Sequence, residues 1–244
     1  MKTVGVIPLR MGSKRFPGKA LHKIKGRPLA EWVYNGAKRS RMLDKLIIAT
    51  DDKKIAEFAE SIGAECVISD KKHSCGSERV AEAVAKYKPK IVVNIQGDEI
   101  GADSELIRFS INAVEGDKYA WAGTVARLLK AKEIENNDNV KVVVDNWKRA
   151  LYFSRCPIPC KADGVKGRVE YYGHVGVYAF RYKFLQKFAE LKPTPLEKAE
   201  KLEQLRILEH GGIISVAFTK NDYISINRKS DIKTAEGKLK LQDN

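Results

Sequence analysis

The segment VGVIPLRMGSKRFPGK, residues 4–19, joins a short apolar run to a loop that combines glycine, serine and positive charge. An apolar run closed by Gly, Ser and Pro is typical of a buried strand that feeds a loop. Glycine lets backbone N–H groups approach an anion, a hydroxyl adds a donor, and cations form charge-assisted hydrogen bonds. The loop therefore predicts a phosphate-binding site made of Arg10, Gly12, Ser13, Lys14, Arg15, Gly18 and Lys19. A solvated basic loop is the alternative, and the loop matches neither a Walker motif nor GxGxxG.

The length of 244 residues and the hydrophobic content of 43% predict one globular domain with a substantial core. No run approaches the roughly 18 consecutive apolar residues of a membrane helix, and MKTVGVIPLR does not resemble a signal peptide. We therefore expect a cytoplasmic protein with no membrane partner. The four cysteines are expected to be reduced thiols, and CPIPC at 156–160 is a weak zinc candidate because no second ligand pair lies nearby.

The formal net charge of +14 is concentrated at the start of the chain, where residues 1–54 carry 14 Lys and Arg against 4 Asp and Glu. A field of this sign attracts anions such as nucleoside triphosphates, sugar acids or nucleic acid. Nucleic acid is the least favoured of these partners, because the sequence has neither a basic helical stripe nor an RNA-binding aromatic motif.

Apolar runs alternate with helical patterns through the first half of the chain. Strands are expected at 4–9, 45–51, 65–69 and 91–95, and helices at 28–37, 52–62 and from about 77. This alternation predicts βαβ units and a parallel sheet, in which ligands bind beyond the carboxyl ends of the strands. Four polar segments follow the strands and are expected to meet there: the Arg10 loop, Asp51, residues 73–79 and residues 96–99.

The second half has shorter connections, which predict mixed or antiparallel strands added to the sheet. Strands are expected at 121–128, 140–145, 150–155, 173–181, 213–218 and 223–227. A helix is expected at 104–114, and a long amphipathic helix is expected from Pro195 to about Leu208, ended by Gly211. A last helix is expected after a cap at Ser230.

Several segments in fixed order resemble the CMP-sugar-acid synthetases, most closely the 3-deoxy-manno-octulosonate cytidylyltransferase (CMP-Kdo synthetase) family. They are VIPLRMGSKRFPGKAL at 6–21, ATD at 49–51, HSCGSERVAEA at 73–83, VVNIQGDE at 92–99, NDNVKVVVD at 137–145, ALYFSRCPIP at 150–159, YGHVGVYAFR at 172–181 and LEKAEKLEQLRIL at 196–208. The resemblance covers nearly the whole chain.

The resemblance implies a Rossmann-like α/β nucleotide-diphospho-sugar transferase fold, with a mostly parallel sheet and an appended antiparallel dimerisation and acceptor subdomain. Residues 1–118 would form the nucleotide-binding half and residues 119–244 the acceptor-binding and dimerisation half of one domain. The implied reaction is attack of a sugar-acid hydroxyl on the α-phosphate of CTP, giving a CMP-sugar and pyrophosphate. The resemblance further implies Mg²⁺, a homodimer and a role in lipopolysaccharide biosynthesis.

The resemblance also implies roles for individual residues. The catalytic group would comprise Arg10, Lys19 and Asp98, with Asp98 as the Mg²⁺ ligand; a helix cap is the alternative for Asp98. The nucleotide would be held by Leu9, Arg10, Ser13, Arg15, Lys19, Ser77 and Arg79. The acceptor would be held by Gln96, Arg155, His174, Glu203 and Gln204. Arg155 suits a carboxylate, while His174 and Gln204 suit hydroxyls. A core position for His174 and a solvated helix face for Glu203 and Gln204 stay open.

The sequence departs from the family pattern at four places. Asn227 stands where the family has its second metal aspartate, and Arg228 and Lys229 follow it. HSCGS replaces HxSGT at 73–77, Ile100 follows QGDE, and Cys160 and Lys161 follow SRCPIP. Because Mg²⁺ favours carboxylates, Asn227 is expected to weaken or relocate the metal. The alternatives are a different acceptor, such as a modified octulosonate, a nonulosonate or a phosphonate, and a catalytically weakened nucleotide-binding homologue.

Overall fold

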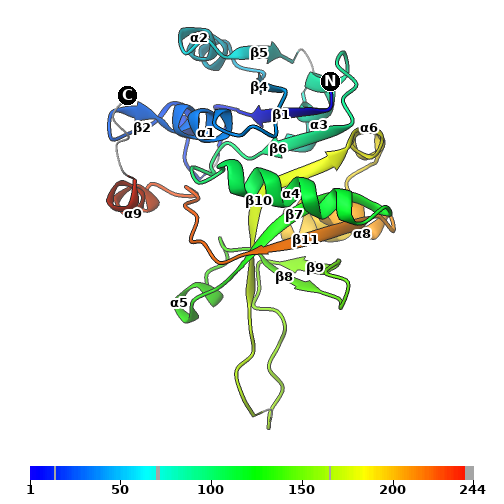
Figure 1. Ribbon diagram of the computed structural model, residues 1–244. Helices are drawn as coiled ribbons and strands as arrows, with labels where there is room; N and C mark the ends of the chain where they lie inside the picture. Colours follow the sequence, from blue (N-terminus) through cyan, green and yellow to red (C-terminus); the bar gives the residue numbers. More distant parts are fainter. Residues whose placement is uncertain (14, 70–71, 165, 240–244) are drawn as a thin grey trace.

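A nine-stranded mixed sheet forms the centre of the computed structural model, which describes residues 1–13, 15–69, 72–164 and 166–239 (Figure 1). The main path runs β11-β7-β10-β6-β1-β4-β5, and a β8–β9 hairpin joins it through β10. The strands are β1 (Thr3–Pro8), β4 (Lys45–Thr50), β5 (Glu65–Ile68), β6 (Ile91–Ile95), β7 (Ala120–Leu128), β8 (Lys141–Val144), β9 (Ala150–Ser154), β10 (Tyr172–Arg181) and β11 (Ile213–Thr219). A separate small ribbon pairs β2 (Lys23–Ile24) with β3 (Arg27–Pro28).

The first half has the expected βαβ arrangement. Strands β6, β1, β4 and β5 are parallel neighbours, and all residues of β1 and β6 are buried. The helices that connect them are α1 (Leu29–Lys38), α2 (Lys53–Ser61) and α3 (Gly76–Val84). Asp52 caps α2 as predicted, because its Oδ1 accepts hydrogen bonds from the N–H groups of Lys54 and Ile55.

The second half is built around one reversed strand. Strand β10 lies between β6 and β7 and is antiparallel to both, while β7 and β11 are parallel to each other. The expected mixed strands are therefore confirmed. Because β10 runs against β6, its first residues lie at the same edge of the sheet as the carboxyl end of β6.

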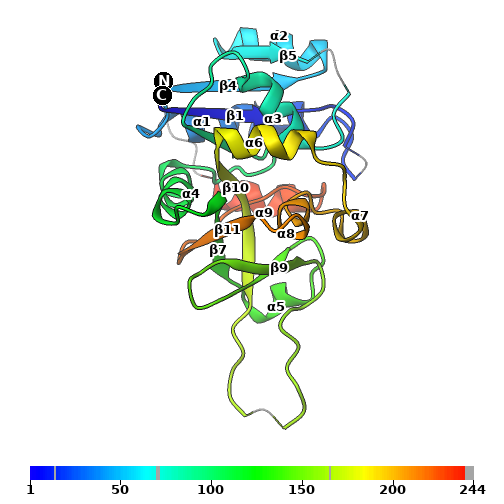
Figure 2. The ribbon, with the colours of Figure 1, turned by 90° about the vertical axis from the view of Figure 1, so that its right-hand side faces the viewer.

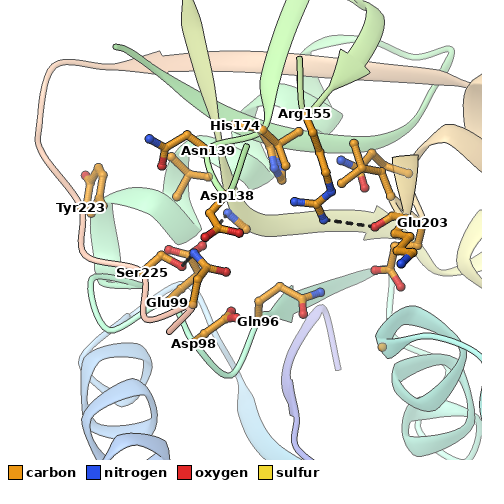
Figure 3. Close-up of a pocket in the computed structure, with 18 of the residues that line it drawn as sticks. Gln96, Asp98, Glu99, Asp138, Asn139, Arg155, His174, Glu203, Tyr223 and Ser225 are labelled. Carbon is orange, nitrogen blue, oxygen red and sulfur yellow. Dashed lines mark hydrogen bonds between the residues drawn. The ribbon is translucent and has the colours of Figure 1, made fainter. Parts of the chain in front are cut away.

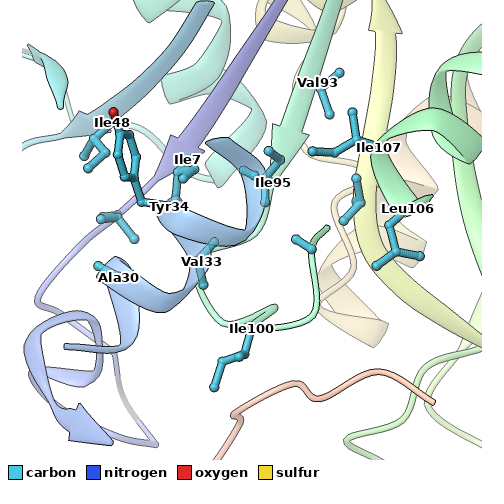
Figure 4. Packing of buried hydrophobic residues seen from close by; sticks show 14 of the residues in the cluster. Ile7, Ala30, Val33, Tyr34, Ile48, Val93, Ile95, Ile100, Leu106 and Ile107 are labelled. Atoms are coloured by element: carbon cyan, nitrogen blue, oxygen red, sulfur yellow. The ribbon is translucent and has the colours of Figure 1, made fainter. Parts of the chain in front are cut away.

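Two layers of apolar side chains cover the two faces of the sheet. One layer includes Val93 and Ile95 with α1, α2 and α4 (Ser104–Gly116), and Figure 4 shows its side chains meeting between helices and sheet. The other includes Val92 with α3, α6 (Tyr182–Glu190) and α8 (Leu205–Glu209). Helix α4 approaches β7 so closely that a Cβ at Gly123 would lie 2.3 Å from the carbonyl oxygen of Ser110.

The single helix predicted from Pro195 to Leu208 is wrong. The structure has α7 (Pro195–Glu200) and α8, separated by Lys201 in the left-handed conformation with φ +55°. Arg206 is fully buried on α8 and donates to both carboxylate oxygens of Glu197 on α7, at 2.8 and 2.6 Å, and to Glu78 at 2.8 Å. These tertiary bonds fold α8 back against α7, which helical periodicity alone does not reveal.

Two further expectations near the end of the chain are corrected. Residues 223–227 form no regular strand; Ser225 makes only an isolated bridge to Glu99. The side chain of Ser230 makes no capping bond to α9 (Asp231–Lys238). Instead, Oδ2 of Asp231 accepts the N–H groups of Asn227 and Arg228, both at 2.8 Å, and so fixes the segment that precedes the helix.

The remaining segments are short helices and a long projection. They comprise α5 (Ala131–Ile134) and a 3₁₀ turn at Lys19–Leu21. In the connection between β9 and β10, the described residues 155–164 and 166–171 extend far from the rest of the molecule (Figure 2). None of the helices in the described part of the chain combines the length and hydrophobicity needed to cross a membrane.

Candidate active site

Two adjoining cavities lie beyond the carboxyl ends of β1 and β6. The large cavity, of about 870 Å³, reaches His174, Glu203 and Gln204. The small cavity, of about 620 Å³, is lined by Leu9 and by Ser13 and Lys19 of the predicted phosphate-binding loop, which runs from Arg10 to Lys19 and is called the phosphate loop below. Both are lined by Arg10, Arg15, Gln96, Asp98, Asp138, Arg155 and Lys201. Three of the four segments predicted to meet here therefore do so, namely the Arg10 loop, residues 73–79 through Ser74, Cys75 and Gly76, and residues 96–99, whereas Asp51 lines neither cavity.

The phosphate loop lies against the end of β6. The Nζ atom of Lys19 is 2.7 Å from Oδ2 of Asp98 and donates to the carbonyl oxygen of Ile226 at 3.0 Å. Gly18, which precedes Lys19, has φ +69°, a conformation that favours glycine. Lys19 and Asp98, which are predicted to bind the same triphosphate, therefore lie in direct contact. Lys14, which is also predicted to belong to the phosphate-binding site, lies outside the described residues.

Two acidic residues follow β6, and of these Glu99 is buried whereas Asp98 is partly exposed. Glu99 is 7% exposed and accepts the N–H of Gly176 at 3.2 Å. Burial, and secondly the charge of Asp98, raises the pKa of Glu99 to about 8. Glu99 is therefore protonated at neutral pH. The helix-cap alternative for Asp98 does not apply, because Asp103 caps α4.

His174 is held in one tautomer. The hydroxyl of Thr124 donates to the carbonyl oxygen of Val177 at 2.9 Å, so it accepts from Nε2 of His174 at 3.0 Å. Burial lowers the pKa of His174 to about 3, so the ring is neutral and Nδ1 is left as an acceptor. His174 is thus both a hydrogen-bonded core residue and a part of the cavity wall.

Arg155 is fixed at the root of the projecting connection. Its Nε donates to the carbonyl oxygen of Glu200 at 2.8 Å, and Nη1 donates to that of Asn137 at 3.0 Å. Below it, the fully buried Lys141 donates to the carbonyl oxygens of Asn136, Asn139 and Arg155 at 3.1, 2.9 and 2.6 Å. These bonds fix the guanidinium where the two cavities meet.

Glu203 and Gln204 lie in the break between α7 and α8. Oε1 of Glu203 accepts the hydroxyl of Ser77 at 2.7 Å, and Oε2 accepts the Ser77 N–H at 3.2 Å. The same hydroxyl accepts Nδ2 of Asn94 at 3.0 Å. The solvated alternative does not hold for Gln204, which is 5% exposed. Figure 3 shows Gln96, Asp98, Arg155, His174 and Glu203 around one space.

Ser77 and Arg79 are placed differently from the other candidates. Both are buried, and neither lines either cavity. Arg79 donates to Asp51 at 2.7 Å, which ties α3 to the segment after β4. Their predicted contact with a nucleotide stays a prediction.

The site offers one carboxylate ligand to Mg²⁺, Asp98, where the family pattern has two. Asp98 offers a carboxylate beside the phosphate loop, and Mg²⁺ is commonly held by one or two carboxylates together with substrate phosphates. Asn227 offers an amide whose Oδ1 lies 3.5 Å from Nη2 of Arg15, so a guanidinium already faces it. The described residues contain no group of three or more His, Cys, Asp or Glu side chains suited to a metal ion.

Three residues of the site were not singled out from the sequence. Glu99 and Asp138 lie within segments that resemble the family, at 92–99 and 137–145, but the sequence predicts no individual role for either residue. Arg228 was noted only as a charge beside Asn227. Asp138 forms ion pairs with Arg15 and with Arg228, a convergence of three distant segments that no local pattern predicts.

Comparison with known proteins shows the family to which the chain belongs. Residues 4–221 match the cytidylyltransferase family. The chain is 40% identical to a 3-deoxy-manno-octulosonate cytidylyltransferase of Bdellovibrio bacteriovorus over 248 residues, covering 99% of each chain. It is 44% identical to the enzyme of that name from an Anaeromyxobacter species over 237 residues, covering 96% of this chain and 95% of the relative.

A solved structure of CMP:2-keto-3-deoxy-manno-octonic acid synthetase in complex with CTP matches with a TM-score of 0.88 and 31% identity, covering 97% of this chain and 98% of that one. A cytidylyltransferase from Leptospira borgpetersenii, at 15% identity and a TM-score of 0.62, shares the fold. The family match over most of the length, the full-length relatives and the similar solved structure agree, and the chain belongs to the cytidylyltransferase family of nucleotidyltransferases, in its CMP-Kdo synthetase branch.

Proposed function

We propose that this chain transfers the cytidylyl group of CTP to a sugar acid of the 3-deoxy-manno-octulosonate type and releases pyrophosphate. The observation that carries the proposal is that all five acceptor candidates line the large cavity, which adjoins the phosphate loop. These candidates are Gln96, Arg155, His174, Glu203 and Gln204. The names of the relatives and the CTP in the similar solved structure support the same substrates.

The chemistry requires positioning and charge neutralisation more than a nucleophilic side chain. The acceptor oxygen bonds to the α-phosphorus while the bond to the bridging oxygen of pyrophosphate breaks, and the hydroxyl proton is lost. Arg10, Arg15 and Lys19 would neutralise the triphosphate, and the Ser13 and Leu9 segment would carry the backbone that the nucleotide contacts. Asp98 would hold Mg²⁺, which when bound would stabilise negative charge on the phosphates.

The acceptor side supplies complementary groups. The Arg155 guanidinium suits the carboxylate of a sugar acid in a bidentate arrangement. Neutral His174 has an acceptor nitrogen for a sugar hydroxyl, and the Gln96 and Gln204 amides both donate and accept. Discrimination would come from these side chains, because unpaired polar groups in such a cavity are costly.

A pyrophosphate-release assay tests the proposal. CTP, with UTP and ATP as controls, is offered with a panel of sugar acids and phosphonates. We expect release with CTP and 3-deoxy-manno-octulosonate. Absence of release with every acid, or release with UTP or ATP but not with CTP, would overturn the proposal.

The panel should include modified acids because a second departure from the family pattern, besides Asn227, lines the large cavity. Cys75 lines the large cavity, whereas Ile100, Cys160 and Lys161 do not. A thiol in place of the family's hydroxyl changes the polarity of the wall. An amino-substituted octulosonate or a nonulosonate is therefore the second candidate acceptor.

We further propose a cytoplasmic homodimer formed through residues 119–244, with residues 1–118 as the nucleotide-binding half. The turn and strand of the β8–β9 hairpin expose Trp147 at 76% and Leu151 at 60%, two large apolar side chains that a second subunit would cover. Light scattering after gel filtration would measure the mass in solution. A monomer at micromolar concentration would contradict the dimer.

A further inference from the structure

The segment Ile226–Arg228 is anchored to both the phosphate loop and the end of β6. The N–H of Ile226 donates to the carbonyl oxygen of Asp98 at 3.0 Å, and the Ile226 carbonyl accepts Nζ of Lys19 at 3.0 Å. Asp231 accepts the N–H of Arg228 at 2.8 Å. The backbone of Arg228 is therefore fixed beside the phosphate loop, and its side chain lines the small cavity.

Beside the phosphate loop, the guanidinium groups of Arg15 and Arg228 form ion pairs with the same carboxylate, Asp138. Nε of Arg228 is 2.5 Å from Oδ2 of Asp138, and Nη1 of Arg15 bonds to Oδ1 of the same group. The Asp138 side chain is only 13% exposed, so the carboxylate shared by the two ion pairs is largely shielded from solvent. Burial alone would raise the pKa of Asp138, but the hydrogen bond from Arg228 and the charge of Arg15 hold it below its usual value. Asp138 therefore stays ionised.

The small cavity has more positive charge than its own carboxylates balance. Two carboxylates, Asp98 and Asp138, line it, and each is already paired with a cation. The cationic side chains along the described wall are Arg10, Arg15, Lys19, Arg155, Lys201 and Arg228. A guanidinium pair binds a phosphate through the same geometry as a carboxylate, and a phosphate brings more charge.

We propose that Arg15 and Arg228 form a binding site for the terminal phosphates of the nucleoside triphosphate and for the released pyrophosphate, and that Asp138 occupies this site while it is free of ligand. The proposal rests on the proposed function, and it assigns Arg228 a direct contact with the leaving group. On binding, the phosphate replaces the Asp138 carboxylate between the two guanidiniums. The two guanidiniums, whose side chains are 45% and 59% exposed and so are open to a ligand, thus supply neutralising charge in the region where Asn227 offers a metal only an amide.

Calorimetric titration with sodium pyrophosphate in EDTA tests this without any reaction. We expect the unchanged chain to bind pyrophosphate and Arg228→Gln to bind it about tenfold more weakly, as for loss of one charge-assisted contact. Lys229→Gln is the matched control, because it removes the same charge at the exposed next position, and it should change the affinity less than twofold. Asp138→Asn should bind pyrophosphate more tightly, because the competing carboxylate is gone.

A double-variant cycle separates a direct contact from an indirect one. If Arg228 contacts the phosphate, Arg228→Gln weakens binding in the Asp138→Asn background as well. Loss of the effect in that background, equal loss in Lys229→Gln, or weaker binding by Asp138→Asn would overturn the inference. The proposed function is tested separately by CTP with Mg²⁺. If the unchanged chain binds CTP but binds no pyrophosphate in EDTA, only the inference fails; if it does not bind CTP, the proposed function fails.

Discussion

Replacement of Arg206 by methionine should destabilise the fold and disturb the acceptor side together. Arg206 has no exposed side-chain surface, and it pairs with Glu197 and Glu78, whose side chains are 11% and 15% exposed. Removing one partner of a buried ion pair costs about 3–5 kcal/mol, because the remaining charge is left without compensation. Arg206 serves two carboxylates, so we expect the upper end of this range.

Urea unfolding at neutral pH measures the loss in the free energy of unfolding. A loss of about 5 kcal/mol corresponds to a fall in melting temperature of roughly 10–20 °C for a chain of this size. Lys192→Met is the control, because it removes one positive charge from an exposed position near the start of α7. Adding Glu197→Gln to Arg206→Met should restore part of the loss, since it removes an uncompensated charge.

The acceptor should also bind less tightly, because Glu203 and Gln204 lie in the break that Arg206 holds. The KM for the acid, measured at saturating CTP, should rise by a larger factor than the KM for CTP, measured at saturating acid. A loss of stability below 1 kcal/mol, or a loss equal to that of Lys192→Met, would refute the reasoning. It would mean that the break between α7 and α8 depends on the apolar contacts alone.

Three further predictions concern the end of β6 and its neighbours. Lys19→Met should lower kcat/KM for CTP by about 10²–10³, as for loss of one group that stabilises developing charge; steady-state rates check this, and a drop below threefold would count against it. The raised pKa of Glu99, about 8, means that the folded state loses stability as pH rises from the ordinary carboxyl range toward 8. Glu99→Gln should therefore unfold with a flatter pH dependence, by up to about 1.4 kcal/mol per pH unit, and parallel denaturation curves would contradict this. Asn227→Asp should lower the Mg²⁺ concentration that gives half-maximal activity, and an unchanged or raised concentration would oppose the assignment of that position.

The sequence predicted the first half of the fold well because each strand and helix there is decided locally. The apolar run before Arg10 and the cap at Asp52 both appear as expected. The break at Lys201 was missed because it depends on Arg206 reaching Glu197 and Glu78, contacts that periodicity does not encode. Helix α6, at Tyr182–Glu190, went unpredicted although Leu185 and Phe188 have helical spacing.

The site was predicted to a similar degree and for a similar reason. Residues at strand ends, such as Gln96 and Asp98, follow from the rule for parallel sheets. Residues that converge from separate loops do not, and Asp138 with Arg228 is the clearest case. The hydrogen bond from Ser77 to Glu203 is another, because it joins residues 126 positions apart in the sequence; the predicted contact of Ser77 with the nucleotide stays a prediction.

The reversed strand β10 has a mechanical consequence. It lies between β6 and β7, and the N–H of Gln96 donates to the carbonyl oxygen of Gly176 at 3.1 Å where the two strands meet. Residues 1–118 and residues 119–244 are thus joined through the middle of one continuous sheet, so they cannot separate as two lobes without breaking the hydrogen bonds between β6 and β10. We therefore expect any change in access to the two cavities to come from the loops that line them, and not from movement of the strands beneath.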